Sequence, residues 1–180
     1  MNCTSCKSGK LVPAYLDELF PCHTCKNCGG NFVLLDAYLR WLESNRNLSF
    51  VQGDAEVEVD ETQQAMICPK TGSIMLKYRI SKNTEHRLDL SPSINAIWMD
   101  KGEWDLIKRE GLAGQLHAVF TDAWQKKIRN AKTEDTLRAM YEREFGENYG
   151  AVREFRNLVS RLPNKAEIIA YLVSDNPYRA

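Results

Sequence analysis

Apolar and polar residues alternate in the first half of the chain in a pattern that predicts two short β-hairpins. Residues 11–16 and 19–23 form the first pair of strand-like segments, joined by a short acidic turn. In the second pair, apolar side chains occupy every other position across residues 74–80 and again at Leu88 and Leu90. A period of two is typical of a strand that buries one face. The first half is therefore expected to contain two small antiparallel β units.

The period changes to that of a helix in the second half. One stripe recurs at helical spacing across residues 115–130 and is expected to be core. Its members are Leu116, Val119, Phe120, Ala123, Trp124 and Ile128. Further helices are expected at 133–145, capped by Thr133, at 149–162 and after residue 164. Their inward-facing residues are expected to be Leu137, Met140, Tyr141, Val152, Phe155, Leu158, Val159, Leu162, Ile168, Ile169 and Leu172. The pattern predicts a helical bundle or hairpin packed on the β units.

A short helix is expected after each β unit. Asp36 can cap a helix across residues 37–42, and Asp100-x-x-Glu103 resembles the capping box that starts another. The expected fold class is α+β, with two small β-hairpin units, an acidic linker and a C-terminal helical region. The expected segments are 1–46, 47–65 (the linker), 66–110 and 111–180.

Charge and hydropathy narrow the possible settings of this 180-residue chain. Its 24 Lys and Arg residues balance 24 Asp and Glu residues, and both signs are spread evenly. A neutral chain disfavours tight electrostatic binding to a nucleic-acid backbone. No run of about 18 apolar residues occurs, so no membrane span is expected. The first residues lack the apolar segment of a secretory signal, and we therefore expect a cytoplasmic protein with reduced thiols.

Four cysteines carry the strongest chemical signal in the chain. Cys3 and Cys6 form one C-x2-C pair, Cys25 and Cys28 form another, and residues 7–24 separate the pairs. This spacing is typical of a structural zinc site. Four thiolates supply the tetrahedral ligand set of Zn²⁺ and leave no open position for chemistry. Two unrelated pairs, or a redox dithiol, are the alternatives, but the βαβ setting of thioredoxin-like dithiols is missing.

Other cysteines and histidines offer weaker alternatives. Cys22 also forms a C-x2-C pair with Cys25, so the ligand register could shift, although the glycine pair follows Cys28 and favours Cys25 and Cys28. A second metal site from Cys68, His86 and Asp89 would have three ligands at unmatched spacing. The preferred interpretation is one zinc ion per chain.

The sequence of the second hairpin resembles a degenerate copy of the first. Aligning Cys68 with Cys3 places Thr71 on Cys6, Ser91 on Cys25 and Ile94 on Cys28. The same alignment places Trp98 on Phe32, at an offset of 65 to 66 residues. This copy keeps the strand alternation and the aromatic residue, but only one of the four ligands. We expect it to fold without metal, with Trp98 buried against the neighbouring helices.

Both copies resemble the transcription-factor-IIB-type zinc-ribbon family, in which CPxC, a hairpin and CPxCGGxW precede a short helix. The first copy matches at Cys3, Cys6, Cys25, Cys28, Gly29, Gly30 and Phe32. The second matches at Cys68-Pro69, Ile97-Trp98 and residues 100–104. The resemblance implies a zinc-ribbon fold with a structural metal, and an analogy with transcription factors.

The expected function is that of a non-enzymatic, zinc-binding interaction or regulatory module with a protein partner. A Gly-rich phosphate loop, an HExxH motif and paired catalytic carboxylates are all missing from the sequence. One alternative is a transcription-related regulator that binds nucleic acid, which the neutral charge disfavours. The other is a redox-sensing or iron-binding protein, because a four-sulfur site also accepts iron.

Overall fold

The structure, a computed structural model, describes residues 1–45 and 58–178. Its contacts divide the chain into two units, Met1–Ala131 and Lys132–Ala180. Most of the expected acidic linker, residues 47–57, lies outside the described residues. The fold is mixed α/β, with an antiparallel sheet and a C-terminal helical region, as the hydropathy pattern predicts.

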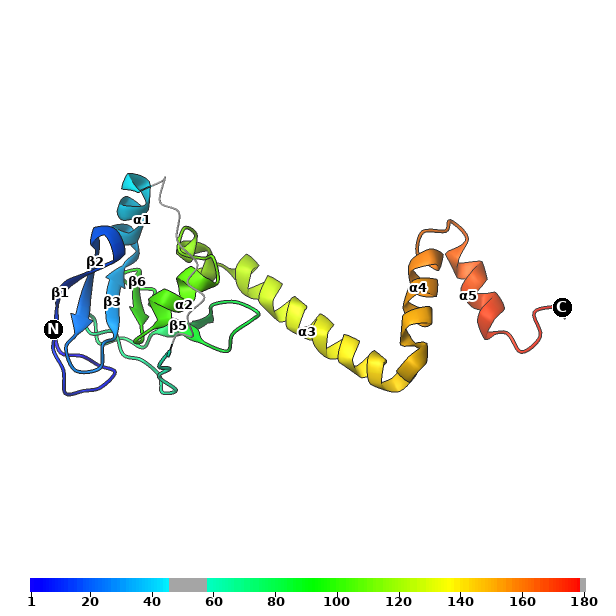
Figure 1. Ribbon diagram of the computed structural model, residues 1–180, viewed down its shortest axis with the longest axis horizontal. Coiled ribbons are helices and arrows are strands. Elements are labelled where there is room, and N and C mark those ends of the chain that lie inside the picture. Colours follow the sequence, from blue (N-terminus) through cyan, green and yellow to red (C-terminus); the bar gives the residue numbers. More distant parts are fainter. Residues whose placement is uncertain (46–57, 179–180) are drawn as a thin grey trace. The chain divides into compact units, whose positions relative to one another are not determined.

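A six-stranded antiparallel sheet organises the first unit (Figure 1). In spatial order its strands are β1 (Leu11–Leu16), β2 (Phe20–Cys25), β3 (Asn31–Leu34), β6 (Ala96–Met99), β5 (Arg87–Ser91) and β4 (Leu76–Arg79). A one-turn 3-10 helix, η1 (Asp17–Leu19), joins β1 to β2. The sheet consists of two three-stranded halves, and the pairing of β3 with β6 places Phe32 opposite Trp98.

Strands β3 and β6 are the part of the sheet that the hydropathy pattern does not predict. Each has four residues, and nearly all of them are buried. A strand covered on both faces shows no alternation and is too short to be told from a loop or a helix segment. Joining the two β units into one sheet therefore depends on the least recognisable strands.

One face of the sheet packs against helices α1 (Leu35–Ser44) and α2 (Glu103–Arg109) and the 3-10 helix η2 (Leu116–Phe120). The Phe20 ring lies 4.8 Å from the Trp41 ring and 5.0 Å from the Trp104 ring, between centroids. Leu116 and Val119 of the predicted stripe are fully buried in this core, whereas Ala123 is exposed. The stripe does not form one helix, because η2 ends at Phe120 and α3 begins at Asp122. Aromatic and aliphatic burial of this kind is the main source of stability of the unit.

The other face of the sheet carries a second core, and Trp98 belongs to it. The expectation that Trp98 packs against the helices is wrong, because successive side chains of a strand point to opposite faces. Its neighbours Ile97 and Met99 point to the helices instead. The Trp98 ring lies against Gly30, where an added Cβ would be 2.3 Å from Cζ2. Trp98 thus links the two halves of the sheet.

Buried carboxylates tie the second half of the sheet to α2. Asp100 accepts hydrogen bonds from the Trp98 indole N–H (2.7 Å) and the Thr62 hydroxyl (2.9 Å). The Glu103 carboxylate accepts the Asp100 backbone N–H at 2.7 Å, which is one half of the predicted capping box. Asp89 pairs with Lys77 at 2.9 Å, yet burial raises the pKa of Asp89 to about 6.

Three helices follow the sheet: α3 (Asp122–Phe145), α4 (Tyr149–Val159) and α5 (Lys165–Val173). The 3-10 helix η3 (Gly146–Asn148) lies between α3 and α4. The expected helix start at Thr133 is wrong, because α3 continues through it. Neighbouring Ala131 and Lys132 are good helix formers, and adding a residue to an existing helix needs no new nucleus.

The predicted core of the C-terminal helices is largely exposed. Across residues 132–178, Val159 is the only large apolar side chain that is buried, at 7% exposure. Phe155 and Leu158, predicted to face inward, are 45% and 58% exposed. A helix buries its apolar stripe only where another layer covers it, and within this unit α3, α4 and α5 cover little of one another's apolar surface. The bundle core expected here is therefore not formed within the second unit.

Candidate metal centre

The structure brings the four predicted ligands together. Cys3 and Cys6 precede β1, Cys25 ends β2, and Cys28 lies in the turn before β3. All four Sγ atoms lie within 4.8 Å of one another. The Cys3 and Cys28 sulfurs are 3.8 Å apart, and those of Cys6 and Cys25 are 3.7 Å apart. Sulfurs around a tetrahedral zinc ion at ~2.3 Å would be about 3.8 Å apart, so the donor set fits this metal.

Backbone hydrogen bonds shape both turns that carry the thiols. The Cys3 N–H donates to the Gly9 carbonyl at 2.9 Å, and the Cys25 N–H donates to the Gly30 carbonyl at 2.8 Å. Gly29 has φ +71°, a left-handed conformation that glycine adopts without strain. Local turn geometry therefore helps to orient the sulfurs.

Gly9 is a site residue that the sequence analysis missed. A Cβ at Gly9 would lie 2.3 Å from the Cys25 Sγ and 3.2 Å from the Cys6 Sγ. The missing side chain thus leaves room for two sulfurs of the site. The available signal was a glycine three residues after the first C-x2-C pair, at the point where the chain turns towards β1.

The thiols differ in how easily they lose a proton. Burial raises the pKa of Cys3 to about 12 and also raises that of Cys28. Hydrogen bonds from Asn27, together with those at Ser8, lower the pKa of Cys6 to about 5. A divalent cation would stabilise all four thiolates, because its charge offsets the cost of burying them. Metal binding here must be coupled to proton release.

Cys22 is excluded from the ligand set by the pleat of β2. Its side chain lies in the core that contacts the helices, whereas Cys25 lies in the core on the opposite face of the sheet. Its Sγ is 3.5 Å from the Thr24 hydroxyl. The alternative register, in which Cys22 would replace Cys28 as the partner of Cys25, is therefore wrong.

Cys68 has no comparable set of ligands. The Cys68 thiol is buried, but hydrogen bonds from Ser91 and Thr71 outweigh burial and lower its pKa. The carboxylate of Asp89 is engaged by Lys77. Within residues 1–45 and 58–178, the four-cysteine group is the only set of three or more His, Cys, Asp or Glu residues placed to share an ion. The Cys68, His86 and Asp89 alternative is not assembled.

Comparison with known families supports the interpretation of the first half of the sheet. A family model described as a transcription factor zinc-finger, of the IIB zinc-ribbon type, matches residues 2–44. The match spans all four clustered cysteines, β1 to β3 and α1. No curated protein and no solved structure has significant similarity to the chain. The matched segment and its four-cysteine group indicate a zinc-ribbon domain suited to bind a metal ion.

Among residues 1–45 and 58–178, no helix combines the length and apolar character needed to cross a bilayer.

Proposed function

We propose that Cys3, Cys6, Cys25 and Cys28 bind one structural Zn²⁺ and that the protein is a non-enzymatic interaction or regulatory module. The observation that carries this proposal is the approach of four Sγ atoms to within 4.8 Å. Four thiolates complete the coordination of zinc and leave no position for a substrate. The role of the metal is then to hold the turns of the first half of the sheet.

The second half of the sheet is, in this proposal, a degenerate ribbon that folds without metal. Its first turn contains a backbone hydrogen bond similar to one at the four-cysteine site, although the turn is one residue shorter. The Cys68 N–H donates to the Ser73 carbonyl at 2.8 Å, as the Cys3 N–H does to Gly9 at 2.9 Å. An isolated β-bridge joins Ile67 to Ile74, as another joins Asn2 to Lys10. The two segments share a backbone plan although their side chains differ.

Left-handed backbone conformations also recur at corresponding positions. Lys7 and Gly72 have φ values of 60° and 72°. Gly29 and Asn95 have φ values of 71° and 48°. Each pair contains one residue other than glycine, and such residues are uncommon in this conformation. The recurrence of the conformation at an offset of 65 to 66 residues supports a duplication.

Metal analysis tests the central proposal. Protein purified with zinc and then desalted should contain about one zinc per chain by inductively coupled plasma mass spectrometry. Removing the metal with a chelator should unfold the first half of the sheet, as measured by hydrogen exchange. A zinc content near zero contradicts the proposal. A content near two would restore a second site at Cys68.

A nucleic-acid-binding regulator is the second candidate. The turns beside the thiol cluster expose Lys7, Lys10 and Lys26, and phosphate backbones are bound by such groups. The neutral overall charge of the chain weighs against this role. Fluorescence anisotropy with labelled DNA and RNA decides between a nucleic-acid-binding regulator and a module that binds protein. Binding that weakens steeply with salt and is lost on replacing the three lysines by glutamate would favour this candidate.

Iron is a further candidate for the same thiols, since a four-sulfur site accepts it. Protein expressed in iron-rich medium would then be coloured and would change absorbance on reduction. Colourless protein containing one zinc per chain would favour the structural role.

A further inference from the structure

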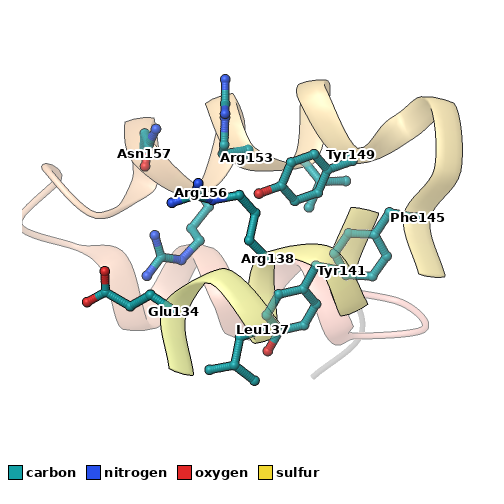
Figure 2. Close-up of a pocket in the computed structure, with 10 residues that line it drawn as sticks. Glu134, Leu137, Arg138, Tyr141, Phe145, Tyr149, Arg153, Arg156 and Asn157 are labelled. Carbon is teal, nitrogen blue, oxygen red and sulfur yellow. The ribbon is translucent and has the colours of Figure 1, made fainter. Parts of the chain in front are cut away.

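A groove lies between α3 and α4, entirely within the second unit (Figure 2). It has a volume of about 760 Å³. Its apolar lining residues come from both helices: Leu137, Tyr141, Phe145, Tyr149 and Val152. Leu137, Tyr141 and Val152 are each more than two-fifths exposed. Exposed apolar side chains that gather in one concave place mark an interaction site.

A second groove, of about 320 Å³, shares Val152 and Arg156 with the first. It lies between α4 and α5 and contains Phe155, Ile169 and Leu172, which are 45%, 47% and 54% exposed. The apolar surface therefore continues along α4. Two neighbouring grooves that share residues of one helix form an elongated apolar surface, which suits a protein segment.

Arginines dominate the charge around the larger groove. Arg138 on α3 and Arg153 and Arg156 on α4 line it, against the single acidic residue Glu134 (Figure 2). The Arg153 guanidinium lies over the Tyr149 ring, 5.8 Å from its centroid. Arg138 approaches Asp135 at 3.5 Å, in a pair whose side chains are both more than half exposed. Exposed pairs of this kind are weak, so these arginines can bind a partner carboxylate.

We propose that this groove binds an amphipathic α-helix of a partner protein, with apolar residues on one face and carboxylates along its flanks. The lining residues of α3 span 134–145, which corresponds to about 18 Å of helix. A partner helix of about three turns would place apolar side chains at i, i+4 and i+7 over this floor. Glutamates or aspartates beside them would meet the arginine rim.

A second copy of the chain is a poorer occupant. A symmetric pairing would place the same surface on both sides, so two linings that each carry three arginines and one acidic residue would face each other. Like charges brought together across an interface oppose association. The charge of the lining thus favours an acidic partner. This inference rests on the proposed interaction role and names its partner class.

The test uses the full-length, zinc-loaded protein and a labelled synthetic peptide. The peptide is a helix of about 18 residues with leucine and phenylalanine on one face and glutamate on the other, and its control replaces every glutamate by lysine. Fluorescence anisotropy should show saturable binding of the acidic peptide that weakens with salt. The lysine peptide should bind at least about tenfold more weakly, because its charges face the arginine rim.

Substitutions of the lining arginines test whether the peptide binds at the groove. The double variant Arg153→Glu, Arg156→Glu should weaken acidic-peptide binding by about tenfold or more and improve binding of the lysine peptide. Arg161→Glu is the matched control, because Arg161 is exposed and does not line the groove. It should leave binding within about twofold.

Three results would overturn the inference. They are equal affinity for both peptides, equal loss in the Arg161→Glu control, and a stable dimer by sedimentation that excludes the peptide. Zinc content, measured on the same samples, separates this inference from the metal proposal. Lost peptide binding with one zinc per chain refutes the groove assignment alone, whereas missing zinc with intact binding refutes the metal proposal alone.

Discussion

The two halves of the sheet hold similar turns by different means. In the first half, Cys3 and three further thiols converge on one point. In the second half, Cys68 lies beside the hydroxyls of Ser91 and Thr71, and only one of the four positions carries a thiol. The backbone hydrogen bonds at the start of each turn are nearly equal in length. The turn itself therefore does not require a full set of thiols.

In the second half, apolar contact across the sheet is proposed to take the place of a metal ion. Trp98 is fully buried, with Met66 and Met75 in the same cluster, and its ring packs against Gly30 of the first half. Cys3, Cys25 and Cys68 all belong to this same buried cluster, which forms one continuous core on this face of the sheet. The four-cysteine group and the turn at Cys68 are consequently expected to support each other through β3 and β6.

The largest expected effect comes from making the same substitution in both halves. Cys25→Ser should reduce zinc from about one per chain to near zero and unfold the first half of the sheet, because it removes a ligand whose metal supplies folding free energy. Cys68→Ser should leave the zinc content unchanged and cost about 1 kcal/mol or less, since serine can keep the hydrogen bonds of Cys68. Metal analysis and thermal melts check both. Zinc loss in Cys68→Ser would contradict the comparison.

Truncation of Trp98 is expected to have the next largest effect. Trp98→Ala should lower the free energy of unfolding of the first unit by about 3–5 kcal/mol, because it opens a cavity between the two halves. It should also weaken zinc binding, since Gly30 rests on the ring and bonds the Cys25 N–H. Tyr178→Ala is the control, because Tyr178 is 84% exposed. Denaturant unfolding and competition with a zinc chelator measure the two effects. Unfolding like wild type would refute the role of Trp98.

Gly9→Ala tests the space around the sulfurs. The added methyl would meet the Cys25 Sγ, so zinc affinity should fall and stability should drop by about 1–3 kcal/mol. Gly150→Ala is the matched control, because an added Cβ at this α4 position has nothing within 4 Å. That change should stabilise the helix slightly. Chelator competition and thermal melts decide, and equal zinc affinity in both variants would show that Gly9 is not needed.

The smallest expected effect is on the pH dependence of stability in the second half of the sheet. Burial raises the pKa of Asp89 from 3.8 to about 6, although Lys77 partly opposes the shift. The folded state thus holds this proton more tightly than the unfolded state does. The stability from Asp89 is fullest below pH 3.8 and is lost as the pH rises through about 6. Asp89→Asn should remove this loss.

Denaturant unfolding of wild type and Asp89→Asn between pH 4.5 and 7 measures the difference. Thiol protonation affects zinc equally in both proteins, so it cancels when they are compared. Parallel pH profiles would show that Asp89 does not titrate in this range.

The ligand set could be predicted from the sequence because the spacing of Cys3, Cys6, Cys25 and Cys28 is a local constraint on a turn and a hairpin. Strand alternation likewise predicted the outer strands, and helical spacing predicted the buried stripe at Leu116 and Val119. Local patterns failed at Thr133 and at Phe155. Whether a helix starts at Thr133 depends on whether the preceding helix continues through it. Whether Phe155 is buried depends on how much apolar surface of other segments covers α4.

Pairing across long sequence distances was decided only in the folded chain. Phe32 and Trp98 meet because two short strands, each without alternation, pair at the centre of the sheet. That pairing also determined on which face of the sheet Trp98 and Cys22 lie. At Gly9, the folded turns leave no room for a side chain. A residue's spacing along the chain determines its local turn and its candidate chemistry. Its face and its neighbours follow from strand register, which depends on packing between segments distant in sequence.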